Sequence, residues 1–142
     1  MRRCRQANRG FTLIELMTAA AVVAILAVFA MTAYFNAQRK GNRSAAEAFL
    51  ASIAQQEQQF FIDNRSYLSC SAPITSATCA LGVQAASNVY TFYTVSVTAT
   101  NTNTPPTFVA SAVPVAGTYQ VKDSAGTLSI NEQGNRTPSG VW

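Results

Sequence analysis

Few side chains in this sequence could do chemistry. The chain contains no histidine, which removes the commonest general base and the Ser-His and Cys-His nucleophile pairs. Two cysteines, Cys70 and Cys79, and one isolated carboxylate, Glu15, are the candidates that remain. The spacing of the cysteines is not that of metal ligands. The sequence therefore predicts neither an enzyme nor a metal site, and it implies no cofactor.

Glu15 is the only charged residue between Phe11 and Gln38. The 23 residues of 16–38 are uncharged and include neither Gly nor Pro. As a helix they would span about 34 Å, enough for a hydrocarbon core of about 30 Å. A charge inside a membrane-length segment costs about 2.5–3.5 kcal/mol on insertion scales, so such a residue usually has a partner and a function. We expect the partner of Glu15 to lie outside the chain's own fold.

The net charge of +4 comes from ten basic and six acidic residues. Four of the arginines, Arg2, Arg3, Arg5 and Arg9, precede the apolar run. Without these four arginines the numbers of basic and acidic side chains are equal. The excess of positive charge is therefore interpreted as a topology signal that keeps the N-terminus in the cytoplasm. Net charge gives no support to a DNA-binding role, and no direct contact with nucleic acid is predicted.

Cys70 and Cys79 are separated by eight residues in a polar, loop-like stretch. This arrangement predicts a disulfide, and a disulfide implies an oxidising compartment outside the cytoplasm. Closing so short a loop would stabilise the fold by about 2–3 kcal/mol. Two free thiols are the alternative. Cys4 precedes the apolar run and is expected to have no structural role.

The elements that position these residues follow from periodicity. After Gly41-Asn42, apolar residues recur mostly at three- and four-residue steps until the polar run 63–66 ends the pattern; they are Ala46, Phe49, Leu50, Ile53, Phe60 and Phe61. The sequence thus predicts one helix of about 50 residues, apolar on all sides in its first half and along one stripe in its second half. We expect the stripe to form the core of a small soluble domain.

The rest of the chain predicts a short antiparallel sheet that covers this stripe, which makes the fold α+β. Alternation and β-propensity predict strands, and polar or Pro-containing runs predict the connections. The predicted order is a connecting loop at 66–88, a strand at 89–97, a turn at 100–106, a strand at 108–113, an edge segment or loop at 119–126, a strand at 127–131 and a turn at 132–135.

The run Arg9–Met17 and the apolar helix after it resemble the N-terminus of type IV prepilins. Further segments over nearly the whole length look like the minor pilins called PilE. These are Asn64–Tyr67, Tyr90–Val97, Thr107–Phe108, Asp123–Ile130, Gly134 and Trp142. The resemblance implies the type IV pilin fold, in which a long N-terminal helix packs on a small antiparallel sheet.

The same resemblance implies four regions. Residues 1–10 would be a leader peptide, 11–38 a transmembrane and assembly helix, 39–65 the amphipathic half of the helix, and 66–142 a globular head with a disulfide loop and the sheet. A prepilin peptidase would cut between Gly10 and Phe11 and methylate the new amino terminus of Phe11. The alternative is a signal peptidase that cuts after the apolar run, near Ala33, although that run is long for a signal peptide.

By the family pattern, the Glu15 carboxylate pairs with the N-terminal amine of a neighbouring subunit. Pairing with its own N-terminus is the alternative. The resemblance implies a structural subunit of a type IV pilus, minor rather than major, that supports pilus assembly, twitching motility, adhesion or DNA uptake. Its partners would be other pilin subunits, the prepilin peptidase and the pilus assembly machinery.

The precursor would lie in the inner membrane with its head in the periplasm, and the mature chain in an extracellular pilus. Two rival interpretations are a type II secretion pseudopilin and a single-pass anchored binding domain that never polymerises.

The sequence departs from the family pattern at two places. Many pilins carry a Gly midway along the apolar helix and a Pro near its end, where this chain has Ala24 and Thr32. Local melting of the helix in a filament is therefore not expected. Pilins of this type often close a C-terminal loop with a disulfide, at positions that here are Ala125 and Val141. The disulfide predicted at Cys70 and Cys79 does not replace that closure, because it lies between the helix and the sheet.

Overall fold

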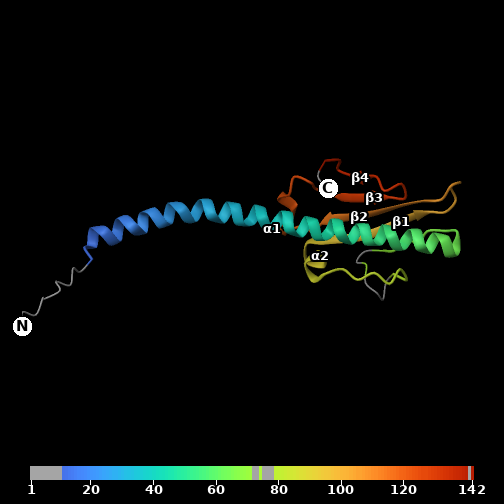
Figure 1. Ribbon diagram of the computed structural model, residues 1–142, viewed down its shortest axis with the longest axis horizontal. Coiled ribbons are helices and arrows are strands. Elements are labelled where there is room, and N and C mark those ends of the chain that lie inside the picture. The colour runs from blue at the N-terminus through green and yellow to red at the C-terminus, as the bar shows by residue number, and fades with distance from the viewer. Residues whose placement is uncertain (1–10, 72–73, 75–78, 141) are drawn as a thin grey trace, which may run out of the picture. The chain divides into compact units, whose positions relative to one another are not determined.

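The computed structural model describes residues 11–71, 74, 79–140 and 142. One compact unit ends at Ala37, and the second, which we call the head, spans Gln38–Trp142. The expected leader, residues 1–10, and Val141 lie outside the described residues. Figure 1 shows the elements of both units along the chain.

Helix α1 runs from Leu13 to Asn64 and contains 52 residues. At its start Thr12 Oγ1 accepts a hydrogen bond from the Glu15 N–H at 3.3 Å, as an N-cap residue does. At its end Arg65 adopts a left-handed conformation with φ 52° and donates its N–H to Phe61 O at 2.8 Å. The prediction of one helix of about 50 residues is confirmed.

The part of α1 that precedes the head is apolar and exposed on all sides. Every described side chain from Phe11 to Gln38 is exposed, including Leu26 and Phe29. By length and composition α1 could cross a membrane, and none of its most apolar stretch is buried inside the structure. This stretch therefore adds nothing to the hydrophobic core of the chain itself.

The head packs the second half of α1 on a four-stranded antiparallel sheet of order β1-β2-β3-β4. The strands are β1 Tyr93–Thr100, β2 Thr107–Pro114, β3 Leu128–Asn131 and β4 Arg136–Thr137. The predicted hairpin is present, with Val97 opposite Ala110 in the β1–β2 register. The sequence did not predict β4, because a two-residue strand is too short to show alternation.

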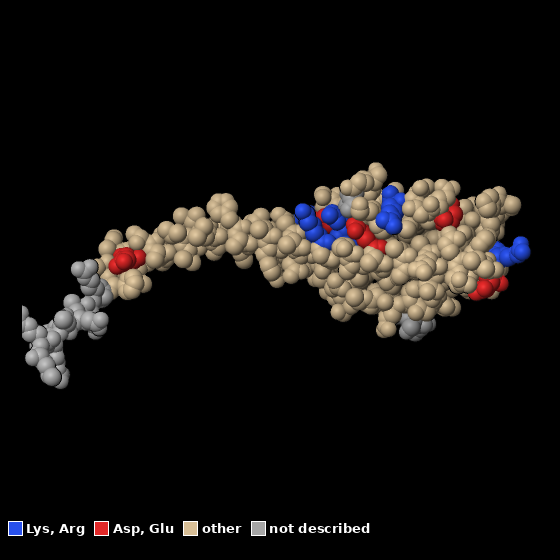
Figure 2. Space-filling view, in the orientation of Figure 1, with Lys and Arg blue, Asp and Glu red and all other residues tan. Residues whose placement is uncertain are grey.

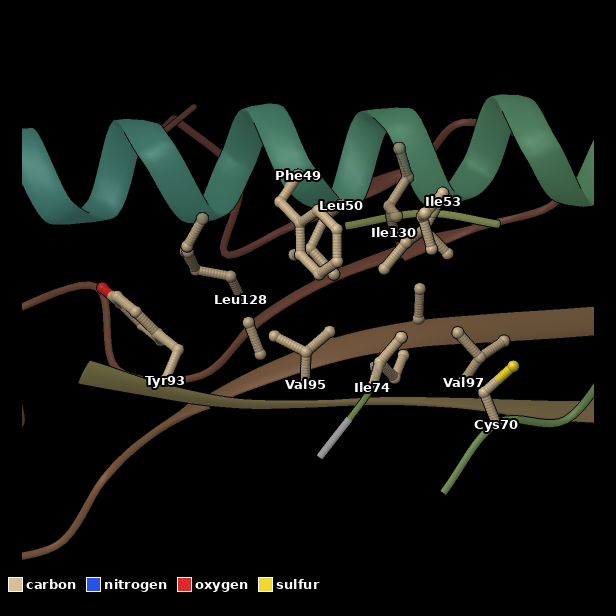
Figure 3. Close-up of a cluster of buried hydrophobic side chains, with 14 of the residues drawn as sticks. Phe49, Leu50, Ile53, Cys70, Ile74, Tyr93, Val95, Val97, Leu128 and Ile130 are labelled. Carbon is tan, nitrogen blue, oxygen red and sulfur yellow. The ribbon is translucent and has the colours of Figure 1, made fainter. Parts of the chain in front are cut away.

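The predicted stripe forms the core of the head. Leu50 and Ile53 on α1 are fully buried, and Figure 3 shows them directed at the side chains of the sheet. The facing residues are Tyr93, Val95 and Val97 on β1, Phe108 on β2, and Leu128 and Ile130 on β3. Burial of each such side chain is worth about 1.5–3 kcal/mol.

The strand predicted at 89–97 is partly wrong, since its first four residues lie in the short helix α2, Ser87–Phe92. Tertiary contacts explain the difference. The Tyr90 ring packs edge-on against Phe49 with centroids 6.4 Å apart, and its hydroxyl accepts the Ala85 N–H at 3.0 Å. Val89 is buried at the same time. A helical turn satisfies these contacts, and they outweigh the β-propensity of so short a run.

The segment 119–126, for which the sequence predicts either an edge segment or a loop, begins with a 3₁₀ helix, η1, Tyr119–Lys122. Its residue Gln120 is fully buried and donates from Nε2 to the Tyr93 hydroxyl at 2.8 Å and to Arg39 O at 3.1 Å. Asn42 Nδ2 donates to Gln120 Oε1 at 3.3 Å. Burial raises the pKa of Tyr93 to about 12, against the lowering effect of the Gln120 hydrogen bond. These bonds fix η1 to α1 where the head begins.

Candidate functional site

Glu15 lies in the first turn of α1, where the positive end of the helix dipole favours a carboxylate. Its backbone is anchored on both sides, by the bond from its N–H to Thr12 Oγ1 and by the Thr18 hydroxyl, which donates to Glu15 O at 3.0 Å. Within the part of the chain that the structure describes, the carboxylate itself makes no hydrogen bond or ion pair. The Glu15 backbone is thus held in place, and its carboxylate is available to a partner.

The surroundings of Glu15 are apolar. Leu13, Ile14, Leu16 and Met17 are all more than half exposed. Phe11, the first described residue, is 79% exposed and lies two residues before α1. Gly10 lies outside the described residues, so the bond expected to be cut is not seen. In the described chain, an exposed phenylalanine therefore precedes Glu15 by four residues, about one helical turn.

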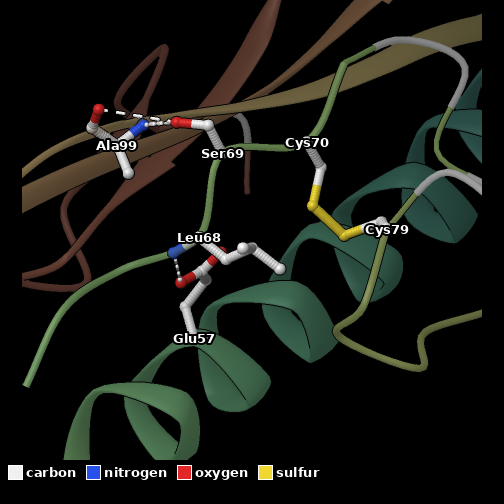
Figure 4. The surroundings of a disulfide bond; sticks show 6 residues. All are labelled: Glu57, Leu68, Ser69, Cys70, Cys79 and Ala99. Atoms are coloured by element: carbon white, nitrogen blue, oxygen red, sulfur yellow. Dashed lines mark hydrogen bonds between the residues drawn. A yellow bond between two sulfur atoms is a disulfide. The ribbon is translucent and has the colours of Figure 1, made fainter. Parts of the chain in front are cut away.

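The two cysteines of the connecting segment are bonded to each other. Cys70 and Cys79 form a disulfide, with both residues buried. Cys70 also pairs with β1, because its N–H donates to Val97 O and its carbonyl accepts the Val97 N–H, each at 2.9 Å. The disulfide thus joins Cys79 to a segment that is itself paired with the sheet. Figure 4 shows this bond and the neighbouring hydrogen bonds between Ser69 and Ala99.

Glu57 is a buried carboxylate that the sequence reasoning missed. Its Oε2 accepts the Leu68 N–H at 2.9 Å beside the disulfide (Figure 4), while its buried Oε1 has no hydrogen-bond partner. Desolvation raises the pKa of Glu57, and the Leu68 hydrogen bond opposes that rise. The signal was available in the sequence, since Glu57 follows Ile53 by four residues and so falls on the apolar stripe.

The charges of the head are mixed in sign. Figure 2 shows Lys and Arg beside Asp and Glu on the visible face. Arg43 pairs with Glu47 at 3.5 Å and with Asp123 at 3.2 Å. Burial raises the pKa of Glu47, and the Arg43 guanidinium counteracts it. Among the described residues, no three or more Cys, Asp and Glu side chains come together as metal ligands would.

Two family models match the chain. The prokaryotic N-terminal methylation motif matches residues 5–31, and the type IV minor pilin ComP, DNA uptake sequence receptor, matches residues 32–129. The chain belongs to this family of type IV minor pilins. The predicted resemblance to type IV prepilins, and to minor pilins in particular, is thereby confirmed.

Relatives of this pilin are themselves pilus components. This pilin is 34% identical over 91 residues to the type IV wide pilus major component PilA4 of Thermus thermophilus. The alignment covers 64% of this chain and 66% of that protein. It is 37% identical over 60 residues to the type IV major pilin protein PilA of Myxococcus xanthus, covering 42% of this chain and 27% of that protein. The pilin thus spans less than two thirds of the length of either relative.

A solved type IV pilin from Shewanella oneidensis has the same fold. It is 26% identical to this pilin with a TM-score of 0.53, and the match covers 73% of this chain and 97% of the other. The predicted fold class, a long N-terminal helix packed on a small antiparallel sheet, is confirmed by this match and by the sheet topology. This pilin is a structural subunit of a type IV pilus.

Proposed function

We propose that this pilin enters the filament through residues 11–38. The observation that carries the proposal is the exposure of every described side chain in this range. An apolar helix whose side chains are exposed along its whole length needs lipid before assembly and the helices of neighbouring subunits after it. The chain would therefore pass from the inner membrane, with its head in the periplasm, to an extracellular pilus.

Processing by a prepilin peptidase would prepare the chain for assembly. The enzyme would remove residues 1–10 by cutting between Gly10 and Phe11, and would methylate the amine of Phe11. Support comes from the methylation motif, whose match at residues 5–31 includes this bond. The buried disulfide between Cys70 and Cys79 supports a head outside the cytoplasm, because such bonds persist in oxidising compartments.

Glu15 would pair with the Phe11 amine of a neighbouring subunit. Its carboxylate has no partner among the described residues of its own chain, and its backbone is anchored in the first turn of α1. Only a neighbour in the correct register can bring an amine to a carboxylate in apolar surroundings. The pair would therefore select the register of assembly more than it would stabilise the filament.

A substitution at Glu15 tests this role. We expect Glu15→Val to leave membrane insertion intact, because it removes a charge from an apolar segment, and to abolish most incorporation into pili. The measurement compares the amount of the variant in the membrane fraction with that in sheared pili. Thr32→Val, an exposed threonine further along the same apolar segment that does not contact Glu15, is the matched control and should be incorporated normally. Normal incorporation of Glu15→Val would refute the registration role.

DNA binding by the head is a second candidate function. The description of the matching family names a DNA uptake sequence receptor. In this pilin, η1 is bonded to α1 near Arg39, which brings Lys122 to the end of the head where Lys40 lies. Both lysines are exposed. They would contact phosphates through charge, although the acidic residues nearby limit the local potential.

Gel-shift titrations of duplex DNA with the full chain in detergent test this candidate. We expect Lys40→Glu combined with Lys122→Glu to weaken binding and to reduce its salt dependence, since each lysine would contribute one phosphate contact. Arg65→Glu, at the opposite end of the soluble part of α1, is the matched charge control. No shift of DNA by the parent protein at low salt would remove this function.

A further inference from the structure

An open hollow lies at the end of the head where α1 stops. It has a volume of about 440 Å³ and is lined by Phe61, Ile62, Arg65 and Pro106. The Phe61 ring stacks on Tyr67 with centroids 4.7 Å apart, which gives the hollow a fixed apolar wall. Ile62 is 71% exposed beside it. A concave apolar site next to an exposed large aliphatic side chain is typical of an interaction surface.

Arg65 lines this hollow with a backbone conformation that is unfavourable for a residue other than glycine. Its φ of 52° lies in the left-handed region, which at the end of a helix is usually occupied by Gly. The conformation is kept by the hydrogen bond from the Arg65 N–H to Phe61 O. Non-glycine residues in this region are concentrated at functional sites. The turn ends the helix at a residue that itself lines the hollow.

Two opposite charges at this end have no partner among the described residues. Asp63 and Arg65 are both exposed, and neither side chain makes an ion pair or a hydrogen bond with any residue that the structure describes. Elsewhere on the head, by contrast, Arg43 is paired with two carboxylates. Figure 2 shows a basic and an acidic group at this end of the head, separated by uncharged surface.

We propose that Phe61–Arg65 and Pro106 form a self-complementary contact surface, the Ile62 surface, for a second copy of this pilin. In a two-fold contact a surface meets itself, so each residue pair occurs twice. Asp63 of each copy would meet Arg65 of the other, and each Ile62 would cover the hollow of the other copy. Each copy thus supplies an acid and a base for the two charge pairs. It also supplies an exposed aliphatic side chain and a hollow for the two apolar contacts.

A contact of this size is weak for a single pair. Stable interfaces bury more than about 1,000 Å² in total, and the Ile62 surface comprises only six residues. Where two filaments bring several copies of this pilin together, their contacts would strengthen one another through multivalency. That extension to filaments rests on the proposed function, whereas the contact between two copies does not.

A charge exchange tests the contact. Arg65→Asp or Asp63→Arg alone would oppose like charges across the two-fold axis, and the double variant would restore opposite charges. Both changes suit the backbone, because Asp tolerates the left-handed region and the helix dipole favours Arg in the last turn. Asn64→Cys, placed between the two charges, reports the contact as a disulfide-linked dimer after oxidation. The experiment uses the full chain in detergent with Cys4→Ser.

We expect the dimer yield to fall about fivefold or more in each single charge variant and to recover in the double variant. Added salt should lower the yield of the parent. Val121→Cys, another exposed aliphatic position of the head, is the matched control and should give little dimer. Equal dimer yields in all four charge backgrounds would overturn the proposal, and so would a yield no higher than that of Val121→Cys. A failed Glu15 test leaves this result unaffected, since the protein is not assembled.

Discussion

Both halves of α1 carry large apolar side chains, and they differ in what covers those side chains. From Phe11 to Gln38 every described side chain is exposed, although most are apolar. From Asn42 to Glu57 the same helix buries a single stripe against the sheet of the head. An apolar side chain stabilises a chain only where that chain covers it. The uncovered half is therefore available to lipid and to other subunits.

Two glutamates on this helix show the same contrast. Glu15 is exposed among apolar side chains, and its carboxylate has no partner among the described residues. Glu57 is buried in the head, where the Leu68 N–H donates to it. The first carboxylate has no described partner, as the proposed pairing with another subunit requires, while the second holds a segment of the chain's own fold. Substitutions in one half should thus change assembly, and those in the other half stability.

The largest expected difference in stability is between two leucines. Leu50→Ala should lower the free energy of unfolding of the head by about 3 kcal/mol, because it opens a cavity in the core. Leu26→Ala removes a side chain that is 61% exposed and should cost less than about 0.5 kcal/mol. Urea unfolding of the full chain in detergent measures both. Equal losses would mean that the uncovered half also packs on the head.

The disulfide should affect the head alone. Replacement of both Cys70 and Cys79 by Ser should lower the unfolding free energy by about 2–3 kcal/mol, because the unfolded chain is no longer constrained. The helix content contributed by residues 13–37 should remain. Near-ultraviolet circular dichroism follows the packing of the head, and far-ultraviolet circular dichroism follows the helix content. If both signals are lost together, the helix of residues 13–37 depends on the head, which would contradict the prediction.

The smallest expected effect concerns pH. The pKa of Glu57 in the folded head is raised above its ordinary value of 4.5, so protonation favours folding. The resulting stability is complete below pH 4.5 and is lost as the pH rises through the raised folded pKa. Glu57→Gln, which does not titrate, should reduce this loss, while Glu47 keeps part of it because burial also raises its pKa.

The control for Glu57→Gln is Asp63→Asn, which removes an exposed carboxylate near the end of the same helix. Thermal unfolding from pH 4 to pH 8 gives the slope for each protein. We expect a smaller slope for Glu57→Gln than for the parent protein and for Asp63→Asn. A steeper loss of stability in Glu57→Gln would show that the buried carboxylate is favoured in its charged form.

The long helix, the hairpin and the core stripe could be predicted because each rests on a periodic pattern over many residues. The start of β1 was predicted four residues too early, since the contacts of Tyr90 with Phe49 and Ala85 favour a helical turn. These contacts join residues distant in sequence, and no local pattern contains them. Strand β4 was missed because two residues carry no period.

Prediction of the candidate sites was uneven for a similar reason. Glu15 could be singled out because one charge interrupts a long apolar run. The buried Gln120 could not, since its importance comes from hydrogen bonds to β1 and α1 that only the folded head brings together. The Ile62 surface also escaped prediction, because the left-handed turn at Arg65 and the hollow at Pro106 depend on tertiary structure.

The N-terminal peptide mass of the mature protein from sheared pili tests whether residues 11–38 serve assembly. If residues 11–38 serve assembly, the chain must keep its uncovered helix after processing. We expect a mature chain that begins at methylated Phe11. A chain that still carries Met1, or one that begins near Tyr34 because a signal peptidase removed the apolar run, would contradict it.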